Sequence, residues 1–128
     1  MDSVVALVRE VGESLQAWRK LGGAEGTWDG SQFHAKADQW AHQLFEVGLS
    51  KLPTSLPVVS EEDLSSTKND GGNRYWLGDP IDGTASYAEG FAGYVTQIAL
   101  MEQESPVLAV VFAPHYQDLF VAVKGDGA

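Results

Sequence analysis

The chain has 128 residues, of which 44% are hydrophobic and 20% charged, a composition that fits one soluble domain with its own core. Its formal net charge of −10 argues against nucleic-acid polymers and anionic membrane surfaces as main partners. The absence of cysteine excludes disulfides and thiolate chemistry, and no apolar run approaches the roughly 18 residues that a membrane-spanning helix needs.

Two amphipathic helices are predicted in the first half of the chain. Apolar residues recur at helical spacing over residues 3–20, and a pair of glycines ends this first helix. The stretch is acidic near its start, unlike a signal peptide, so we expect a cytoplasmic protein. A loop or short hairpin over residues 21–35 leads to a second helix over residues 37–52, which Pro53 ends.

Short strands are predicted in the second half. One covers residues 57–60 and another residues 74–78, each leading into a group of acidic residues. Three more, over 94–101, 107–112 and 119–124, are joined by short turns and form an antiparallel meander. Two helices followed by a meander predict an α+β fold, in which both helices pack on one face of a largely antiparallel sheet.

Carboxylates gather at or just past the ends of the first two predicted strands. They are Glu61, Glu62, Asp63, Asp79 and Asp82. If those strands are neighbours, the acids converge, and a hard divalent cation such as Mg²⁺ relieves their repulsion because it prefers oxygen ligands. Gly83 lets the backbone approach an anion closely, and Thr84 offers a hydroxyl and an amide to a phosphate. The competing interpretation is that these acids are solvated loop ends.

The string SEE at 60–62, followed by WLGDPIDGT at 76–84, closely resembles the inositol monophosphatase superfamily. Its members, which include inositol monophosphatases and 3'(2'),5'-bisphosphate nucleotidases, are Mg²⁺-dependent and commonly lithium-sensitive phosphomonoesterases. The resemblance runs from about residue 3 to the end, with support at 107–114 and 124–128. It implies that the chain adopts the first half of the inositol monophosphatase fold.

The resemblance also implies a set of metal ligands. Glu61 and Asp79 would ligate the metals through their carboxylates, and Ile81 through its backbone carbonyl. Asp82 would bind a second metal and face the substrate. Glu62 matches a family acid that supports the site.

A catalytic pair and a phosphate site follow from the same resemblance. Thr84, oriented by Asp38, would polarise a metal-bound water. The amides of Gly83 and Thr84 would hold the phosphate, with Asp82 beside the substrate. Metals lower the pKa of bound water and neutralise charge on a transferring phosphoryl group, so these assignments are chemically coherent.

Family members are roughly twice this length and carry a second α/β region, which supplies another metal-binding aspartate and most of the substrate pocket. We therefore expect residues 1–128 to form a single N-terminal inositol-monophosphatase-like domain, with that second domain absent. The predicted function is hydrolysis of a small phosphorylated polyol or 3'-phosphonucleotide. The alternative is a truncated, non-catalytic metal-binding or interaction module. A homodimer could complete the site from a second copy.

The substrate class stays open between two branches of the superfamily. The strings SEED at 60–63 and RYWL at 74–77 resemble the bisphosphate nucleotidase branch, whereas Ile81 within DPIDGT is common in the inositol branch.

Overall fold

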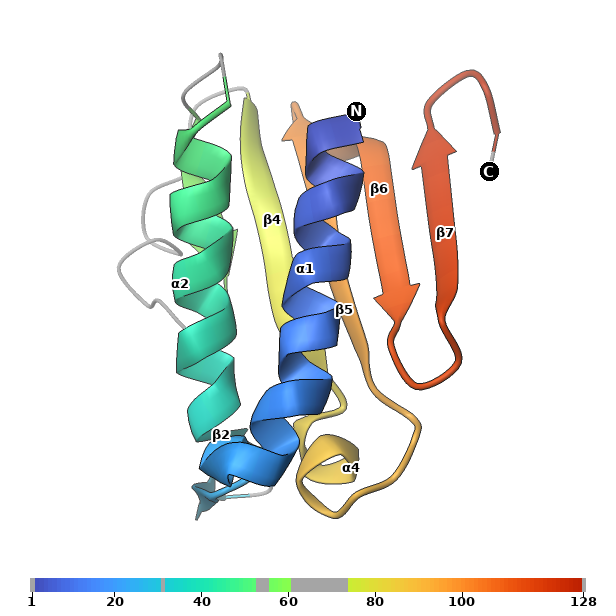
Figure 1. Cartoon of the computed structure of the whole chain (residues 1–128). Helices are drawn as coiled ribbons and strands as arrows, with labels where there is room; N and C mark the ends of the chain where they lie inside the picture. The colour runs from blue at the N-terminus through green and yellow to red at the C-terminus, as the bar shows by residue number, and fades with distance from the viewer. Residues whose placement is uncertain (1, 31, 53–55, 61–73, 128) are drawn as a thin grey trace.

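The computed structural model describes residues 2–30, 32–52, 56–60 and 74–127. Two long helices lie side by side against one face of a five-stranded sheet, and a small hairpin and a short helix close one end of the molecule (Figure 1). In chain order the elements are α1 (Asp2–Trp18), η1 (Arg19–Gly23), β1 (Gly26–Asp29), β2 (Gln32–Ala35), α2 (Lys36–Ser50), β3 (Val58–Ser60), β4 (Arg74–Asp82), α4 (Thr84–Ala88), β5 (Val95–Glu102), β6 (Ser105–Ala113) and β7 (Asp118–Val123).

Both predicted helices form because their apolar residues fall on one side of the helix. In α1 the buried residues follow helical spacing: Val4, Leu7, Val8, Val11 and Leu15. At Gly22 the chain takes a left-handed turn, with φ of 93°, and leaves the helix. The segment between the two helices is the short antiparallel hairpin β1–β2. None of the helices in the described part of the chain is both long and apolar enough to span a membrane.

The sheet has the strand order β3-β4-β5-β6-β7. β4 to β7 form the predicted antiparallel meander, while β3 runs parallel to β4 at one edge. The α+β fold, with helices on one face of a largely antiparallel sheet, is therefore confirmed. The limits of one strand are corrected: β4 does not end at Gly78 but continues to Asp82, because pairing with β5 carries on through the acidic motif.

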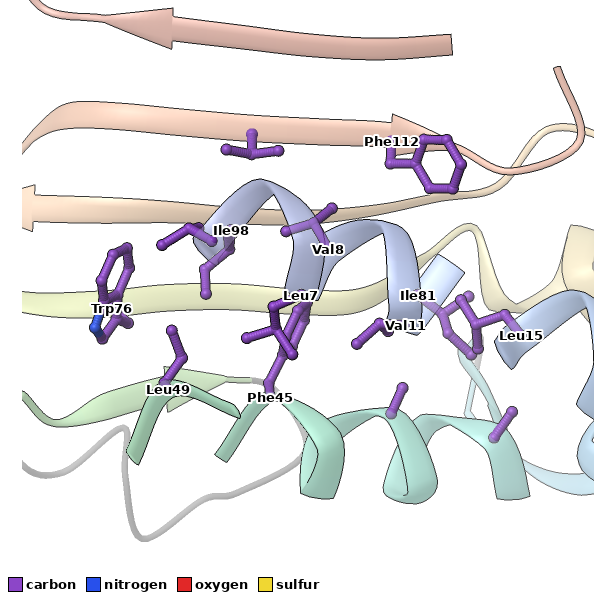
Figure 2. Close-up of a cluster of buried hydrophobic side chains, with 14 of the residues drawn as sticks. Leu7, Val8, Val11, Leu15, Phe45, Leu49, Trp76, Ile81, Ile98 and Phe112 are labelled. Carbon is purple, nitrogen blue, oxygen red and sulfur yellow. The ribbon is translucent and has the colours of Figure 1, made fainter. Parts of the chain in front are cut away.

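The core lies between the helices and the sheet. Figure 2 shows the side chains of α1 meeting Phe45 and Leu49 of α2 on one side and the sheet residues Trp76, Ile98 and Phe112 on the other. Gly12 allows a close approach of α1 to the sheet, because a Cβ there would stand 2.3 Å from a ring carbon of Phe112. The helices and this face of the sheet thus form one continuous apolar cluster.

Side chains on the opposite face of the sheet alternate with those of the core. Leu77 on β4 and Phe120 on β7 are 42% and 60% exposed there. A shallow cavity of about 300 Å³ opens on this face, between Leu77, Ala99, Ala109 and Val111. Asp79 and Gln97 lie at its edge and connect it to the acidic motif.

Candidate active site

The acidic motif contains a bulge in β4. Asp79 pairs with Gln97 and Asp82 pairs with Val95, so two residues of β4 stand opposite a single residue of β5. Asp79 is half-buried and Asp82 is exposed. The side-chain amide of Gln97 donates a hydrogen bond to Oδ2 of Asp82 at 3.3 Å. The bulge therefore places Asp79 opposite Gln97 in the ladder and Asp82 within hydrogen-bond distance of the same glutamine, although the two aspartates are three positions apart.

A glycine turn separates the motif from α4. Gly83 has a φ of 92° in the left-handed region, where residues with a Cβ are strained. A Cβ at this position would also stand 2.7 Å from the carbonyl oxygen of Gly93. Only glycine allows the chain to turn this sharply while the segment before β5 packs against it. The short helix α4 follows at once, beginning with Thr84.

The hydroxyl of Thr84 joins two other predicted site residues. Its oxygen lies 3.3 Å from Oδ1 of Asp38 and 3.2 Å from the carbonyl oxygen of Ile81. The hydroxyl has one proton, so it donates to one of these acceptors at a time. Asp38 is 1% exposed, and its other oxygen accepts the backbone N–H of Ala35 at 2.8 Å. This second bond caps α2 and fixes the carboxylate that faces Thr84.

The structure thus joins Asp38, Ile81 and Thr84 in one hydrogen-bonded group, with Asp79 and Asp82 on the adjoining bulge. The other predicted acids, Glu61, Glu62 and Asp63, lie outside the described residues. Among the residues that are described, no group of three or more His, Asp or Glu side chains could by itself hold a metal ion. The predicted convergence of all five acids stays a prediction.

Sequence reasoning missed Gln97. The signal was present, since a single amide interrupts the apolar strand VTQIAL at 95–100. A polar side chain in such a strand needs a partner, and here that partner is Asp82. The pairing itself could not be foreseen, because it depends on the register of β4 against β5 and on the bulge.

The oxygen donors at this end of β4 fit a hard divalent cation. Two carboxylates and one backbone carbonyl are the ligand types that Mg²⁺ takes, and Mg²⁺ needs only one or two protein carboxylates. The exposed side chain of Asp82 can reach a ligand from solvent. The carbonyl of Ile81 has a second lone pair beyond the one that Thr84 contacts. The residues are compatible with a metal at Asp79, Ile81 and Asp82.

The α+β fold, with these acids beside a threonine–aspartate pair, is the arrangement that the resemblance of the sequence to the inositol monophosphatase superfamily implies. The sequence pattern of the inositol monophosphatase family matches residues 2–128, and the chain belongs to this family. It is similar to the 3'(2'),5'-bisphosphate nucleotidase CysQ of Escherichia coli (strain K12), with 33% identity over 129 residues that cover 98% of this chain and 52% of CysQ.

Solved structures agree with the family assignment. The suppressor protein SuhB of Bartonella henselae superposes with a TM-score of 0.86 and 26% identity over 99% of this chain and 49% of SuhB. An IMPase/NADP phosphatase complexed with NADP and Ca²⁺ superposes with a TM-score of 0.83 and 20% identity, over 98% of this chain and 48% of the phosphatase chain. The chain thus spans about half the length of these relatives.

Proposed function

We propose that this chain is the metal- and phosphate-binding part of a Mg²⁺-dependent phosphomonoesterase, acting on a small phosphorylated polyol or a 3'-phosphonucleotide. The observation that carries the proposal is the contact of the Thr84 hydroxyl with Asp38 and with the carbonyl of Ile81. The first contact links Thr84 of the family motif DPIDGT to a buried carboxylate 46 positions earlier, and the second lies within the motif itself.

The threonine–aspartate pair has a definite chemical role in this proposal. When the Thr84 hydroxyl donates its hydrogen bond to Oδ1 of Asp38, its oxygen lone pairs are free to accept a hydrogen bond from a water molecule. That arrangement would orient a water for attack on phosphorus. Because Asp38 is buried and accepts a hydrogen bond from the backbone N–H of Ala35, its carboxylate stays oriented toward the Thr84 hydroxyl.

The metal site would consist of Asp79, Asp82 and the carbonyl of Ile81, with Glu61 as a further ligand and Glu62 in support. Bound there, Mg²⁺ would supply charge neutralisation and Lewis-acid activation. The Ca²⁺ held by the IMPase/NADP phosphatase supports a divalent ion. The amides of Gly83 and Thr84 would hold the phosphate. The family supports an inositol phosphate as substrate, and the likeness to CysQ supports a bisphosphate nucleotide.

The competing function is a non-catalytic module that binds metal without turnover. The observation that favours it is the exposed apolar face with Leu77 and Phe120, which is unusual for a self-sufficient small enzyme. The two functions differ in a single measurable property. The enzyme releases phosphate when it holds Mg²⁺, whereas the module holds Mg²⁺ and releases none.

The experiment measures phosphate release from inositol 1-phosphate and from adenosine 3',5'-bisphosphate while Mg²⁺ is titrated. We expect release that Li⁺ inhibits, that Asp79→Asn abolishes, that Thr84→Ala lowers sharply to a measurable residual rate, and that Asp118→Asn preserves. Asp118 is the matched control because it is an exposed aspartate at the start of β7.

Calorimetric Mg²⁺ binding by the folded chain separates the remaining outcomes. Binding that Asp79→Asn removes, without phosphate release, supports the module. If the folded chain shows no Mg²⁺ binding and no phosphate release, both functions are refuted for this chain.

A further inference from the structure

One cation stands at the junction between α1 and the segment that presents Thr84. Arg19 is the first residue of η1, where the chain leaves α1. Its guanidinium carbon lies 4.8 Å from the ring centre of Tyr87 and 4.7 Å from that of Tyr94. Both distances are within the roughly 6 Å over which a cation is attracted to an aromatic face. The two rings meet edge to face, with centres 5.0 Å apart, so one cation contacts an aromatic pair.

The same guanidinium also holds the backbone between the two tyrosines. Its Nη2 donates a hydrogen bond to the carbonyl oxygen of Phe91 at 3.0 Å. The hydroxyl of Tyr87 donates to the carbonyl oxygen of Leu15 at 2.6 Å, one turn before Arg19 on α1. The end of α1 therefore contacts residues 83–94, called here the 83–94 loop, at α4, at the turn after α4 and just before β5. Figure 1 shows α4 beside this end of α1.

The 83–94 loop is closed on itself, so contacts at one point fix the others. Gly83 and Gly93 lie close together at its two ends, because a Cβ added to Gly83 would stand only 2.7 Å from the carbonyl oxygen of Gly93. Inside it, the amide of Phe91 donates to the carbonyl of Ser86 at 2.8 Å, and the amide of Tyr87 donates to that of Gly83 at 3.0 Å. Thr84 belongs to this loop and moves with it.

Asp38, which contacts the Thr84 hydroxyl, belongs to a different element, α2. Asp38 lies in the first turn of α2, and α2 packs against the end of α1 through the rings of Trp40 and Trp18, whose centres are 5.5 Å apart. Arg19 follows Trp18 directly. The residue that holds the 83–94 loop is thus joined by one peptide bond to the residue that packs on the helix carrying Asp38.

We propose that Arg19 is a positioning residue that locks the 83–94 loop to the end of α1 and so fixes the Thr84 hydroxyl against Asp38. This inference rests on the proposed role of Thr84. Arg19 acts through Thr84 and touches no reacting atom. The contact geometry requires a guanidinium, because one group must lie against two rings and donate to a carbonyl at the same time.

The test compares Arg19→Gln and Arg19→Lys with Arg9→Gln. Arg9 is the matched control because it lies on α1, which leads into η1, and its guanidinium also faces an aromatic ring, that of Phe112 at 5.5 Å, away from the 83–94 loop. All three variants are first compared with the parent in urea unfolding, which records any general loss of stability.

Hydrogen exchange tests the lock without any turnover. We expect Arg19→Gln to reduce protection of the Tyr87 and Phe91 amides by about tenfold or more, as the loss of a partly buried cation–π and hydrogen-bonded contact implies. Arg19→Lys should keep part of that protection, and Arg9→Gln all of it. Equal protection in Arg19→Gln and Arg9→Gln would overturn the inference.

A double-mutant cycle tests whether Arg19 acts through Thr84. Arg19→Gln should lower kcat on the order of 10²-fold in the parent, the effect of a misplaced reacting group, and change KM little. In a Thr84→Ala background the same substitution should change the residual kcat little. An equal loss in both backgrounds would overturn the inference. If the parent itself releases no phosphate, the proposed function fails, and the exchange experiment still decides whether Arg19 locks the loop.

Discussion

The two faces of the five-stranded sheet carry similar residues but have different surroundings. On the helix-covered face, Trp76 and Ile98 are 5% and 3% exposed, whereas on the other face Leu77 and Phe120 remain open. β6 is apolar on both faces, as its central residues VLAVVF at 107–112 show. Strands with continuous apolar runs are typical of sheets covered on both sides. The sequence of β6 is thus suited to more burial than the described part of the chain provides.

This difference teaches where the stability of the chain originates. The apolar cluster that α1, α2 and the sheet share supplies the burial, and the open face contributes little. The acidic motif lies between these two environments, because Asp79 borders the open face while Thr84 at its end contacts the buried Asp38 of α2. Four experiments test the contrast.

The largest effect is expected from truncating a ring on the covered face. Phe45→Ala should lower the free energy of unfolding by about 3–5 kcal/mol, because Phe45 is 1% exposed and the helix–sheet core cannot fill the space. Phe120→Ala, the same change on the open face, should cost about 0.5 kcal/mol or less. Urea unfolding measures both, with Phe45→Leu as a milder variant if Phe45→Ala does not fold.

A similar cost for both rings would break the comparison, because it would mean that the open face is covered in solution. Sedimentation equilibrium then shows whether a second copy of the chain covers it.

Adding volume should also have opposite results on the two faces. Gly12→Ala places a methyl group 2.3 Å from the buried ring of Phe112 and should cost about 1–3 kcal/mol. Ala99→Val adds apolar volume at the open cavity and should be neutral or stabilising, because valine suits a strand. Thermal unfolding reports both changes. Strong destabilisation by Ala99→Val would show that the cavity side is already tightly packed.

Alkaline pH should lower the free energy of unfolding, because Tyr87 is buried as a neutral phenol on the helix-covered side. Burial raises the pKa of Tyr87 well above the ordinary value of a tyrosine, the neighbouring Tyr94 adds to this, and Arg19 opposes it. Because the pKa of Tyr87 is raised in the folded state, the contribution of Tyr87 to the free energy of unfolding is complete below the ordinary tyrosine pKa. This contribution is lost as the pH rises beyond that value. We expect a loss of up to about 1.4 kcal/mol per pH unit above pH 10.

Tyr87→Phe should be less stable at neutral pH, because it loses the bond to Leu15, but its stability should fall less steeply at alkaline pH. Urea unfolding over a pH series measures the slope. Identical slopes in the parent and the variant would contradict this account, because they would mean that Tyr87 has the same pKa in the folded and the unfolded chain.

The smallest effect is expected at an ion pair that lies in solvent. Lys36 donates to Glu25 at 2.9 Å, with both side chains more than half exposed. This hydrogen bond, and then the charge of Lys36, lower the pKa of the Glu25 carboxyl. Lys36→Gln should raise that pKa in an NMR titration while unfolding stability hardly changes, because water and salt screen such pairs. A clear loss of stability would contradict this account.

The sequence predicts the elements well because each rests on local patterns. Helical spacing indicates α1 and α2, and apolar runs between turns indicate β5 to β7. The string DPIDGT locates the acids and the turn into α4. The bulge in β4 was not predicted, although Pro80 within it lacks the N–H that a regular ladder needs.

The part of the site that the sequence could not show is the part made by distant residues. The contacts of Arg19 with Tyr87 and Tyr94 join residues that share no motif or periodicity. Asp38 was predicted as the partner of Thr84 only through family resemblance, and the structure provides the contact while the catalytic role remains a proposal. Glu61 and Glu62 lie outside the described residues, so their predicted roles at the metal site stay predictions.

The long sequence separations in the 83–94 loop also have a kinetic consequence. Arg19 and Phe91 are 72 positions apart, as are Leu15 and Tyr87, whereas the β5–β6 and β6–β7 hairpins are local. Contacts between distant residues form only after the entropy of closing a large chain loop has been overcome. During refolding, the meander should therefore gain protection before the loop that carries Thr84. The chain would reach a nearly native sheet while the proposed catalytic hydroxyl is still unplaced.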